Sequence, residues 1–182
     1  MFKSDKLHQT TTYTKMNRFP KLFSESRDYL KSKKDLKILS YGCSTGEEVL
    51  TLREYFKEAS IVGAEINKNA LSICRRRKVD DKMKFIESTN YNIKKEGKFD
   101  LVFCMAVLQK KPHYVTKERI KSLKEIYPFE KFEKQVKELD TYLNKGGIMV
   151  IHYSQYDFND VDISSKYMPL GNCNQDDSKL AI

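Results

Sequence analysis

The sequence predicts an α/β fold with a mainly parallel sheet and helices on both of its faces. Two observations support this: short apolar runs typical of strands alternate with helical stretches, and they do so at the spacing of βαβ units. With 182 residues, 40% of them hydrophobic, the chain is long enough for one well-packed domain. We divide it into an N-terminal arm and helix (1–35), a central domain (36–158) and a C-terminal tail or reduced edge (159–182).

The predicted elements follow one another in a regular order. Residues 1–20 are polar and are expected to form an arm, and a loosely amphipathic helix follows. Asn67 is placed to cap the helix that it starts, and Pro128 interrupts the last helical stretch. The expected strands are 36–41, 60–66, 83–88, 99–105 and 148–154, and the expected helices are 21–34, 47–57, 67–78 and 116–144.

Composition narrows the possible functions. No run approaches the roughly 20 apolar residues of a membrane span, and the N-terminus lacks the apolar region of a secretory signal, so we expect a cytoplasmic protein. Cys43, Cys74, Cys104 and Cys173 form no C-x-x-C pair, which favours free thiols over a metal site. The net charge of +9 is spread along the chain, which favours solvated lysine-rich faces over a nucleic-acid partner.

A glycine turn, GCSTGEE at 42–48, separates an expected strand from an expected helix. This arrangement places free backbone N–H groups at the carboxyl edge of the sheet, where α/β folds bind ligands. A P-loop is excluded because no lysine follows Gly46. A dinucleotide fingerprint fits poorly, because Ser44 and Glu47 stand where glycines would be needed.

Acidic residues beside this turn favour a cationic ligand. An anion would meet the carboxylates of Glu47 and Glu48, whereas an ammonium or a sulfonium group would be attracted. For Glu48 we favour a role in complementing the helix dipole; for Glu47 that role and a ligand contact are both open. Glu65 ends the next expected strand, where an acidic side chain can accept both hydroxyls of a ribose. The turn and Glu65 together predict a nucleoside that carries a positive charge.

Five segments also resemble a known family when they are read together. They are ILSYGCSTGEE, IVGAEINKNAL, MKFIESTNYNI, FDLVFCMAVLQ and LNKGGIMVIH, within residues 36–154, and they resemble the class I S-adenosylmethionine-dependent methyltransferases. CSTGEE is most similar to the variant of the chemotaxis-receptor glutamate methyltransferases and of small uncharacterised relatives. The resemblance implies a Rossmann-like three-layer sandwich and S-adenosylmethionine as the cofactor. The family's final antiparallel hairpin is hard to find after Ser154, so the sheet is expected to be reduced or truncated there.

The resemblance also implies which residues hold the cofactor. Ser40 and Thr89 or Asn90 depart from the common pattern, because many members carry acidic residues at these places. The implied contacts are Tyr41, Gly42, Cys43, Ser44, Thr45, Gly46 and Glu47 around the methionine moiety, Glu65, Ile66 and Asn67 at the ribose and adenine, Thr89 and Asn90 near the adenine amine, and Met105, Ala106 and Val107 beside the sulfonium.

Methyl transfer from a sulfonium is an in-line displacement, so the protein contributes mainly positioning and exclusion of water. His152 and His113 are the candidate general bases, and a structural role is the alternative for each. The leading hypothesis is O-methylation of a small-molecule or glycan-like acceptor. The alternatives are a protein carboxylate methyltransferase and a non-catalytic domain that binds the cofactor or a partner. Nucleic acid is disfavoured, because the Asn/Asp-Pro-Pro-Tyr motif is absent and the Arg75–Lys78 cluster ends a helix.

Overall fold

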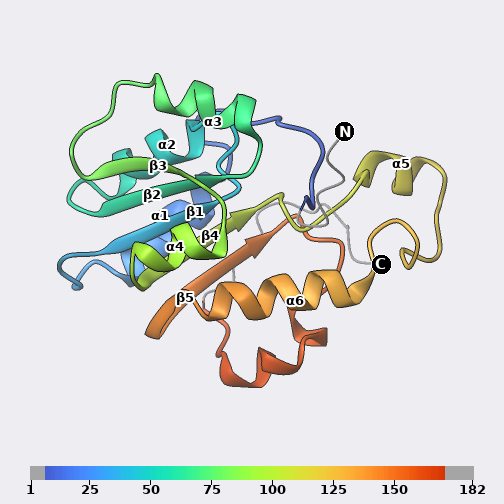
Figure 1. The fold of residues 1–182 in the computed structure, drawn as a ribbon. Helices are drawn as coiled ribbons and strands as arrows, with labels where there is room; N and C mark the ends of the chain where they lie inside the picture. Colours follow the sequence, from blue (N-terminus) through green and yellow to red (C-terminus); the bar gives the residue numbers. More distant parts are fainter. Residues whose placement is uncertain (1–6, 171–182) are drawn as a thin grey trace.

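Five parallel strands form the centre of the molecule in a computed structural model that describes residues 7–170 (Figure 1). The order across the sheet is β3-β2-β1-β4-β5, so the strand order reverses between β1 and β4. Such a reversal opens a crevice at the carboxyl ends of the strands. The strands are β1 (Lys37–Tyr41), β2 (Ser60–Glu65), β3 (Met83–Glu87), β4 (Phe99–Met105) and β5 (Leu143–His152).

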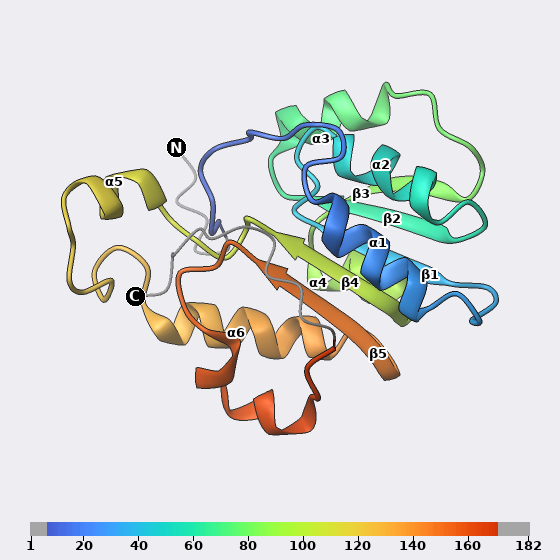
Figure 2. The same ribbon diagram turned by 180° about the vertical axis from the view of Figure 1, so that it is seen from behind.

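Helices cover both faces of this sheet, which confirms the predicted three-layer α/β fold (Figures 1 and 2). Three helices, α1 (Pro20–Tyr29), α2 (Glu47–Tyr55) and α3 (Lys68–Arg75), pack on one face. The other face carries α4 (Asn90–Lys95) and α6 (Phe129–Asp140). The short α5 (Pro112–Lys117) stands apart at the carboxyl edge (Figure 1), and the 3-10 helices η1 (Phe158–Asp160) and η2 (Asp162–Lys166) follow β5.

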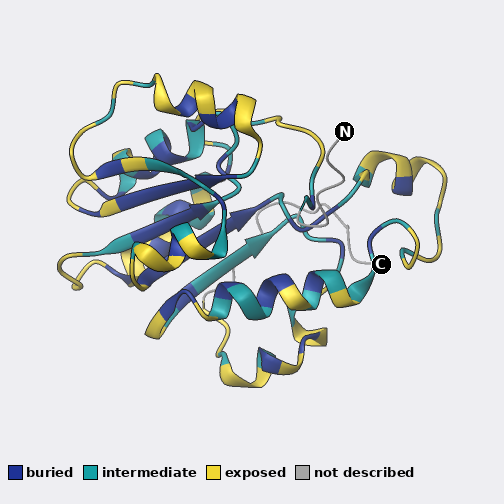
Figure 3. Cartoon of the chain, in the orientation of Figure 1, coloured by how far each residue is buried: buried dark blue, intermediate teal, exposed yellow. Residues whose placement is uncertain are grey.

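The core has two halves because successive strand residues point to opposite faces. In β4, Leu101 and Phe103 pack with α1 to α3, whereas Val102 and Cys104 pack with α4 and α6. All seven residues of this strand are buried, and Figure 3 shows the dark blue of buried residues concentrated in the central strands β1, β2 and β4, whereas β5 is mostly intermediate or exposed. Burial on both faces explains why the strands appear in the sequence as continuous apolar runs.

Several predicted boundaries are correct and others are wrong. Asn67 caps α3 as predicted, since its side chain accepts hydrogen bonds from two backbone N–H groups. The helical stretch predicted at 116–144, with a break at Pro128, is confirmed after the proline, where α6 begins at Phe129, and wrong before it, because α5 ends at Lys117. Arg119 has a left-handed φ of 50°, which ends α5, and proline favours an extended residue before it.

The region around β5 also differs from the prediction. The NKGG segment was expected to end a helix, but β5 begins at Leu143, which pairs with Phe99 across a register shift. No helix was expected where α4 forms, and Thr89 caps it by accepting a hydrogen bond from Asn92 N. The first difference arises from the pairing of β5 with β4, which a local pattern does not contain, whereas the Thr89 cap of α4 is a local signal.

The chain after β5 bears on the predicted final hairpin. Within residues 153–170 the structure contains 3-10 helices and no strand, and the tail 171–182 lies outside the described residues together with Cys173. Cys43, Cys74 and Cys104 are buried free thiols, as predicted. No helix in the described part of the chain has both the length and the apolar character to cross a membrane.

Candidate functional site

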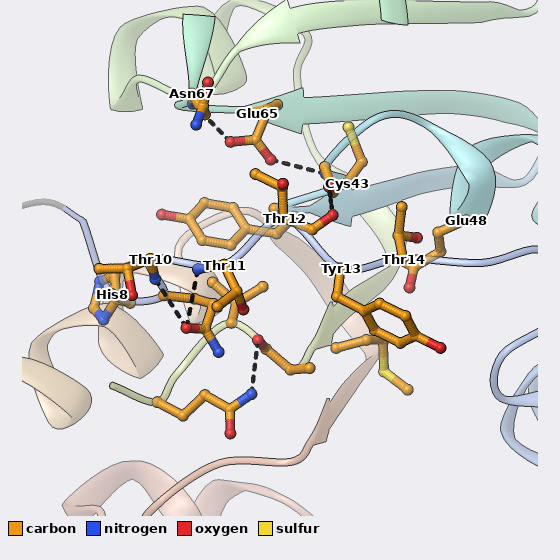
Figure 4. Close-up of a pocket in the computed structure, with 18 of the residues that line it drawn as sticks. His8, Thr10, Thr11, Thr12, Tyr13, Thr14, Cys43, Glu48, Glu65 and Asn67 are labelled. Atoms are coloured by element: carbon orange, nitrogen blue, oxygen red, sulfur yellow. Dashed lines mark hydrogen bonds between the residues drawn. The ribbon is translucent and has the colours of Figure 1, made fainter. Parts of the chain in front are cut away.

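A cavity of about 600 Å³ opens at the carboxyl edge of the sheet, beside the reversal of strand order (Figure 4). Its walls come from the loop after β1, the ends of β2 and β4, the segment 111–114 around the start of α5, and the N-terminal arm. A volume of this size is typical of sites for small molecules, which usually hold roughly 300 to 1,000 Å³.

The loop after β1 approaches the end of β4 closely. Gly42 has a φ of 74°, and a Cβ atom there would lie 2.5 Å from Val107 Cγ2, so only glycine fits without a shift. The backbone N–H groups of Gly42 and Cys43 both donate to Ala64 O, which ties the loop to β2. Ser44 follows with a left-handed φ of 52°. The loop is therefore fixed on both sides before any ligand binds.

Glu65 is the buried acidic group at the end of β2. It is only 6% exposed, and Figure 4 shows its carboxylate between the β1 loop and the start of α3. Its Oε2 accepts from Ser44 N at 2.8 Å, and its Oε1 accepts from Asn67 N at 2.6 Å. Burial raises the pKa of this carboxyl above its usual value, although these backbone donors act in the opposite direction. Each oxygen keeps a lone pair that can accept from a ligand hydroxyl.

Glu47 and Glu48 occupy different environments. Glu47 is not among the residues that line the cavity: it forms an ion pair with Arg77 and accepts from Thr45 Oγ1 at 2.6 Å. Glu48 lines the cavity, and its Oε1 accepts from Ser40 Oγ at 2.7 Å. Burial raises the pKa of Glu48 to about 7, whereas the Ser40 hydrogen bond and the charge of Arg18 act to lower it. The carboxylate that faces the cavity is therefore Glu48, for which the sequence favoured only a role at the helix end.

The N-terminal arm forms one wall of the cavity. Every residue from Leu7 to Lys15 lines it, whereas the sequence predicted an arm without a packing role. Ser44 Oγ donates to Thr12 O at 2.7 Å, so the arm is joined to the β1 loop. Further along, Asn17 N donates to Thr51 Oγ1 at 2.9 Å, which fixes the arm against α2. The arm crosses the carboxyl edge of the sheet from one layer to the other (Figure 2).

His8 anchors the beginning of the arm. Its ring is 5% exposed, with Nδ1 at 2.5 Å from Tyr127 Oη and Nε2 at 3.2 Å from Gln135 Oε1. Burial, assisted by the charge of Lys131, lowers the pKa of His8 to about 4, so the imidazole is neutral near pH 7. Both ring nitrogens are engaged, which leaves His8 without a free nitrogen for proton transfer in this arrangement.

The two histidines predicted as bases lie in different places. His113, in α5, lines the cavity. His152, the last residue of β5, is not among the lining residues: its ring packs against Phe19 with centroids 5.1 Å apart and against Tyr153 at 4.3 Å. Its backbone oxygen accepts from Ala106 N at 2.8 Å. The structure therefore gives His152 contacts on the α1 face of the sheet and places His113 at the cavity.

The structure brings most of the predicted cofactor residues to one cavity. Those that line it are Tyr41, Gly42, Cys43, Ser44, Glu65, Ile66, Asn67, Met105, Ala106 and Val107. Those that do not are Thr45, Gly46, Glu47, Thr89 and Asn90. Gly46 and Thr89 stand at the N-caps of α2 and α4, and Ser88 lines the cavity next to Thr89.

Several lining residues were missed from the sequence, above all Glu48, Arg18 and the whole arm from Leu7 to Lys15. For Glu48 a signal exists: it precedes Thr51 and Leu52 by three and four residues, and both of these face the protein interior.

Arg77 was interpreted as part of a basic helix end. It turns back instead, to donate to Thr45 O at 2.5 Å and to pair with Glu47.

Comparisons with known proteins agree with this geometry. A family model described as a methyltransferase domain matches residues 32–177. The plantazolicin methyltransferase BpumL, in complex with SAH and a pentazolic analogue, superimposes with a TM-score of 0.53 at 16% identity, over 76% of this chain and 49% of that one. WbdD, crystallised with a kinase inhibitor, gives 0.51 at 17% identity, over 78% of this chain and 33% of that one. No curated protein matches the sequence significantly.

At these identities the solved structures show a shared fold, and the chain spans half or less of their length. The family model, by contrast, covers most of the sequence, including every strand of the sheet. The chain therefore belongs to the methyltransferase domain family and has the Rossmann-like fold of its class I, S-adenosylmethionine-dependent members.

Proposed function

We propose that this chain is an S-adenosylmethionine-dependent methyltransferase that transfers the methyl group to an oxygen atom of a small-molecule or glycan-like acceptor. The observation that carries the proposal is Glu65: a buried carboxylate at the end of β2, oriented by two backbone donors and facing the cavity. In this position it would accept the two ribose hydroxyls of the cofactor. Ile66 would pack against the adenine, and Asn67 lies beside it in the same wall.

The charges at the other end of the loop fit the methionine moiety, which carries an ammonium and a carboxylate group. Glu48 lines the cavity and would face the ammonium group. Arg18 lines the same cavity, and its positive charge acts to lower the pKa of Glu48. The sequence placed Glu47 in this role, but its carboxylate is already paired with Arg77. Glu48 therefore takes the position that the resemblance gave to its neighbour.

When bound, the cofactor supplies an electrophilic methyl group on a positively charged sulfur. The chain's own contribution is then to position the two reactants and to exclude water. Met105, Ala106 and Val107, at the end of β4, would form the floor beside the sulfur. The arm from Leu7 to Lys15 would close the opposite side. For an alcohol acceptor, His113 is the cavity histidine that could accept a proton.

Calorimetry with S-adenosylhomocysteine tests the cofactor site. We expect micromolar binding by the wild-type protein and a loss of at least tenfold in Glu65→Ala, with a smaller loss in Glu65→Gln, which keeps one acceptor oxygen. Glu87→Ala is the matched control, because Glu87 is the register partner of Glu65 on β3 and does not line the cavity. Absence of binding at millimolar ligand would contradict the proposal.

Transfer itself requires a second experiment. Labelled methyl groups from S-adenosylmethionine should appear in small-molecule fractions of a cell lysate. Hydriodic acid should release them as methyl iodide at a temperature that cleaves O-methyl groups and leaves N-methyl groups in place. Label found mainly in protein would favour a protein carboxylate methyltransferase. Binding of the cofactor without transfer to any fraction would favour a non-catalytic domain of the same fold.

A further inference from the structure

The loop between β4 and α5 holds two residues in a left-handed backbone conformation. Ala106 has a φ of 58° and Lys111 a φ of 49°, and both residues line the cavity. Residues other than glycine rarely adopt this conformation, because the Cβ atom crowds the following carbonyl. Such strain persists where surrounding contacts impose it, and it gathers at functional sites. The loop is therefore held in a shape that its own residues disfavour.

Two buried glutamines, Gln109 and Gln155, impose this shape, and we refer to them as the glutamine clamp. Gln155 Oε1 accepts from Lys110 N at 2.6 Å, and its Nε2 donates to Lys110 O at 3.1 Å. Gln109 Nε2 donates to Ala106 O at 3.1 Å. Both side chains are 6% exposed. The clamp holds the backbone of Lys110 and thereby fixes the position of the Lys111 Cα atom, from which the side chain extends.

The Lys111 side chain carries a positive charge that no carboxylate in the described part of the chain pairs with. Its ammonium group sits 5.7 Å from the centre of the Tyr114 ring. The acidic residues of the cavity wall are Glu48 and Glu65. Both belong to the β1 and β2 side, where each accepts a hydrogen bond from the protein.

The topology separates these charges. Glu65 ends β2, whereas Lys111 follows β4, on the other side of the reversal of strand order. If the acidic side receives the cofactor, the Lys111 side receives the acceptor. The ring nitrogens of His8, the buried histidine of this cavity, are both engaged by Tyr127 and Gln135. Three cations line the cavity: Lys15 and Arg18 belong to the chain before α1, and Lys111 is the one that follows β4.

We propose that Lys111 recognises a carboxylate or phosphate group on the acceptor, so that the acceptor is an anionic small molecule, and that the glutamine clamp positions Lys111 for this contact. The inference rests on the proposed methyl-transfer function and adds the chemical class of its substrate. The same ammonium group could instead bind the carboxylate of the cofactor. Separate measurements of cofactor binding and of acceptor use distinguish these two sources.

The test combines labelled S-adenosylmethionine with small-molecule lysate fractions separated on an anion exchanger. Transfer should reside in the retained, anionic fractions. Lys111→Ala should lower the rate at least tenfold at a fixed amount of fraction, while Lys111→Arg keeps most of it and S-adenosylhomocysteine affinity changes less than twofold. Gln155→Ala should raise the amount of fraction needed for half-maximal rate more than it lowers the maximal rate, as expected of a positioning residue.

Lys117→Ala is the matched control, since Lys117 ends α5 and does not line the cavity. Transfer found only in unretained fractions, or a Lys111→Ala protein as active as the wild type, would overturn the inference. A tenfold loss of S-adenosylhomocysteine affinity in Lys111→Ala would also overturn it, by assigning the lysine to the cofactor. Failure of the wild-type protein to bind S-adenosylhomocysteine would instead contradict the proposed function itself.

Discussion

Two adjacent glutamates show how a single residue's role depends on distant partners. Glu47 pairs with Arg77, thirty residues further along the chain, and this contact takes it out of the cavity wall. Glu48 lines the cavity, where its carboxylate accepts a hydrogen bond from Ser40 Oγ. The sequence predicted an acidic wall for a cationic ligand. It favoured Glu47 over Glu48 as the residue that contacts the ligand, because the pairing of Glu47 with Arg77 depends on the tertiary fold and is not visible in the local pattern.

The raised pKa of Glu48 predicts a pH dependence of cofactor binding. In the free protein this carboxyl has a pKa of about 7, and a nearby ammonium group would lower it, because an opposite charge favours the ionised form. The complex then holds fewer protons than the free protein, so affinity rises with pH up to about 7 and levels off above it. Over one pH unit the rise is at most about tenfold.

Calorimetry of S-adenosylhomocysteine at pH 5.5, 6.5 and 7.5 measures this effect. Glu48→Gln should bind more weakly and lose the pH dependence, whereas the Glu47→Gln control should keep it. An affinity that is flat with pH in the wild-type protein would show that Glu48 does not face the ammonium group.

At the scale of elements, the strands could be predicted from the sequence, whereas the roles of the arm and of the segments between strands could not be predicted as well. Burial on both faces makes β4 a continuous apolar run, and its predicted range was correct. The arm was not recognised as a wall because its contacts are remote in sequence: His8 and Tyr127 are 119 residues apart. The helical stretch predicted before Pro128 is wrong beyond Lys117, whereas the apolar stripe predicted after the proline forms α6 as expected.

Gly42 tests the close approach between the β1 loop and β4. Gly42→Ala would introduce both the unfavourable φ of 74° and a clash with Val107. Gly146→Ala is a matched control, because Gly146 has the same φ of 74° with no atom within 4 Å of the added Cβ. We expect about 1 kcal/mol of destabilisation from the φ alone in Gly146→Ala and at least about 1 kcal/mol more in Gly42→Ala, by chemical unfolding. Equal losses would show that the Val107 contact is unimportant.

The buried His8, which anchors the arm, predicts that the free energy of unfolding falls at acidic pH. The His8 pKa is lowered to about 4 in the folded protein from an ordinary value of 6.5, so the unfolded state binds more protons between these values. The stability contributed by neutral His8 is present above pH 6.5 and is lost as the pH falls toward 4, with about 3 kcal/mol as an upper limit. His8→Gln removes this dependence, and at pH 7.5 it costs about 1 to 3 kcal/mol through lost buried hydrogen bonds.

Chemical unfolding at pH 7.5 and pH 5 measures the difference between the wild type and His8→Gln. The difference should shrink at the lower pH, and His113→Gln, a change at a histidine exposed in the cavity wall, should show no comparable effect. A difference of equal size at both pH values would contradict a neutral, buried His8.

At the scale of the whole molecule, function follows from the reversal of strand order. The reversal between β1 and β4 leaves the ends of β2 and β4 on either side of one crevice, and the arm crosses over it. This arrangement was predictable in outline from the alternation of strands and helices. The composition of the crevice was predictable only in part, because 13 of its 30 lining residues come from the arm at 7–15 and from the segment 111–114, which join the cavity through tertiary contacts.

Hydrogen exchange of backbone amides, with and without S-adenosylhomocysteine, tests the central claim in one measurement. The account predicts slower exchange on binding in three separate segments: the arm at 7–15, the β1 loop at 41–48 and the end of β2 at 64–67. The opposite edge of the sheet, at 95–98 and 141–145, should be unaffected. Unchanged exchange in all three segments at saturating ligand, or protection confined to the opposite edge, would contradict the placement of the cofactor in this cavity.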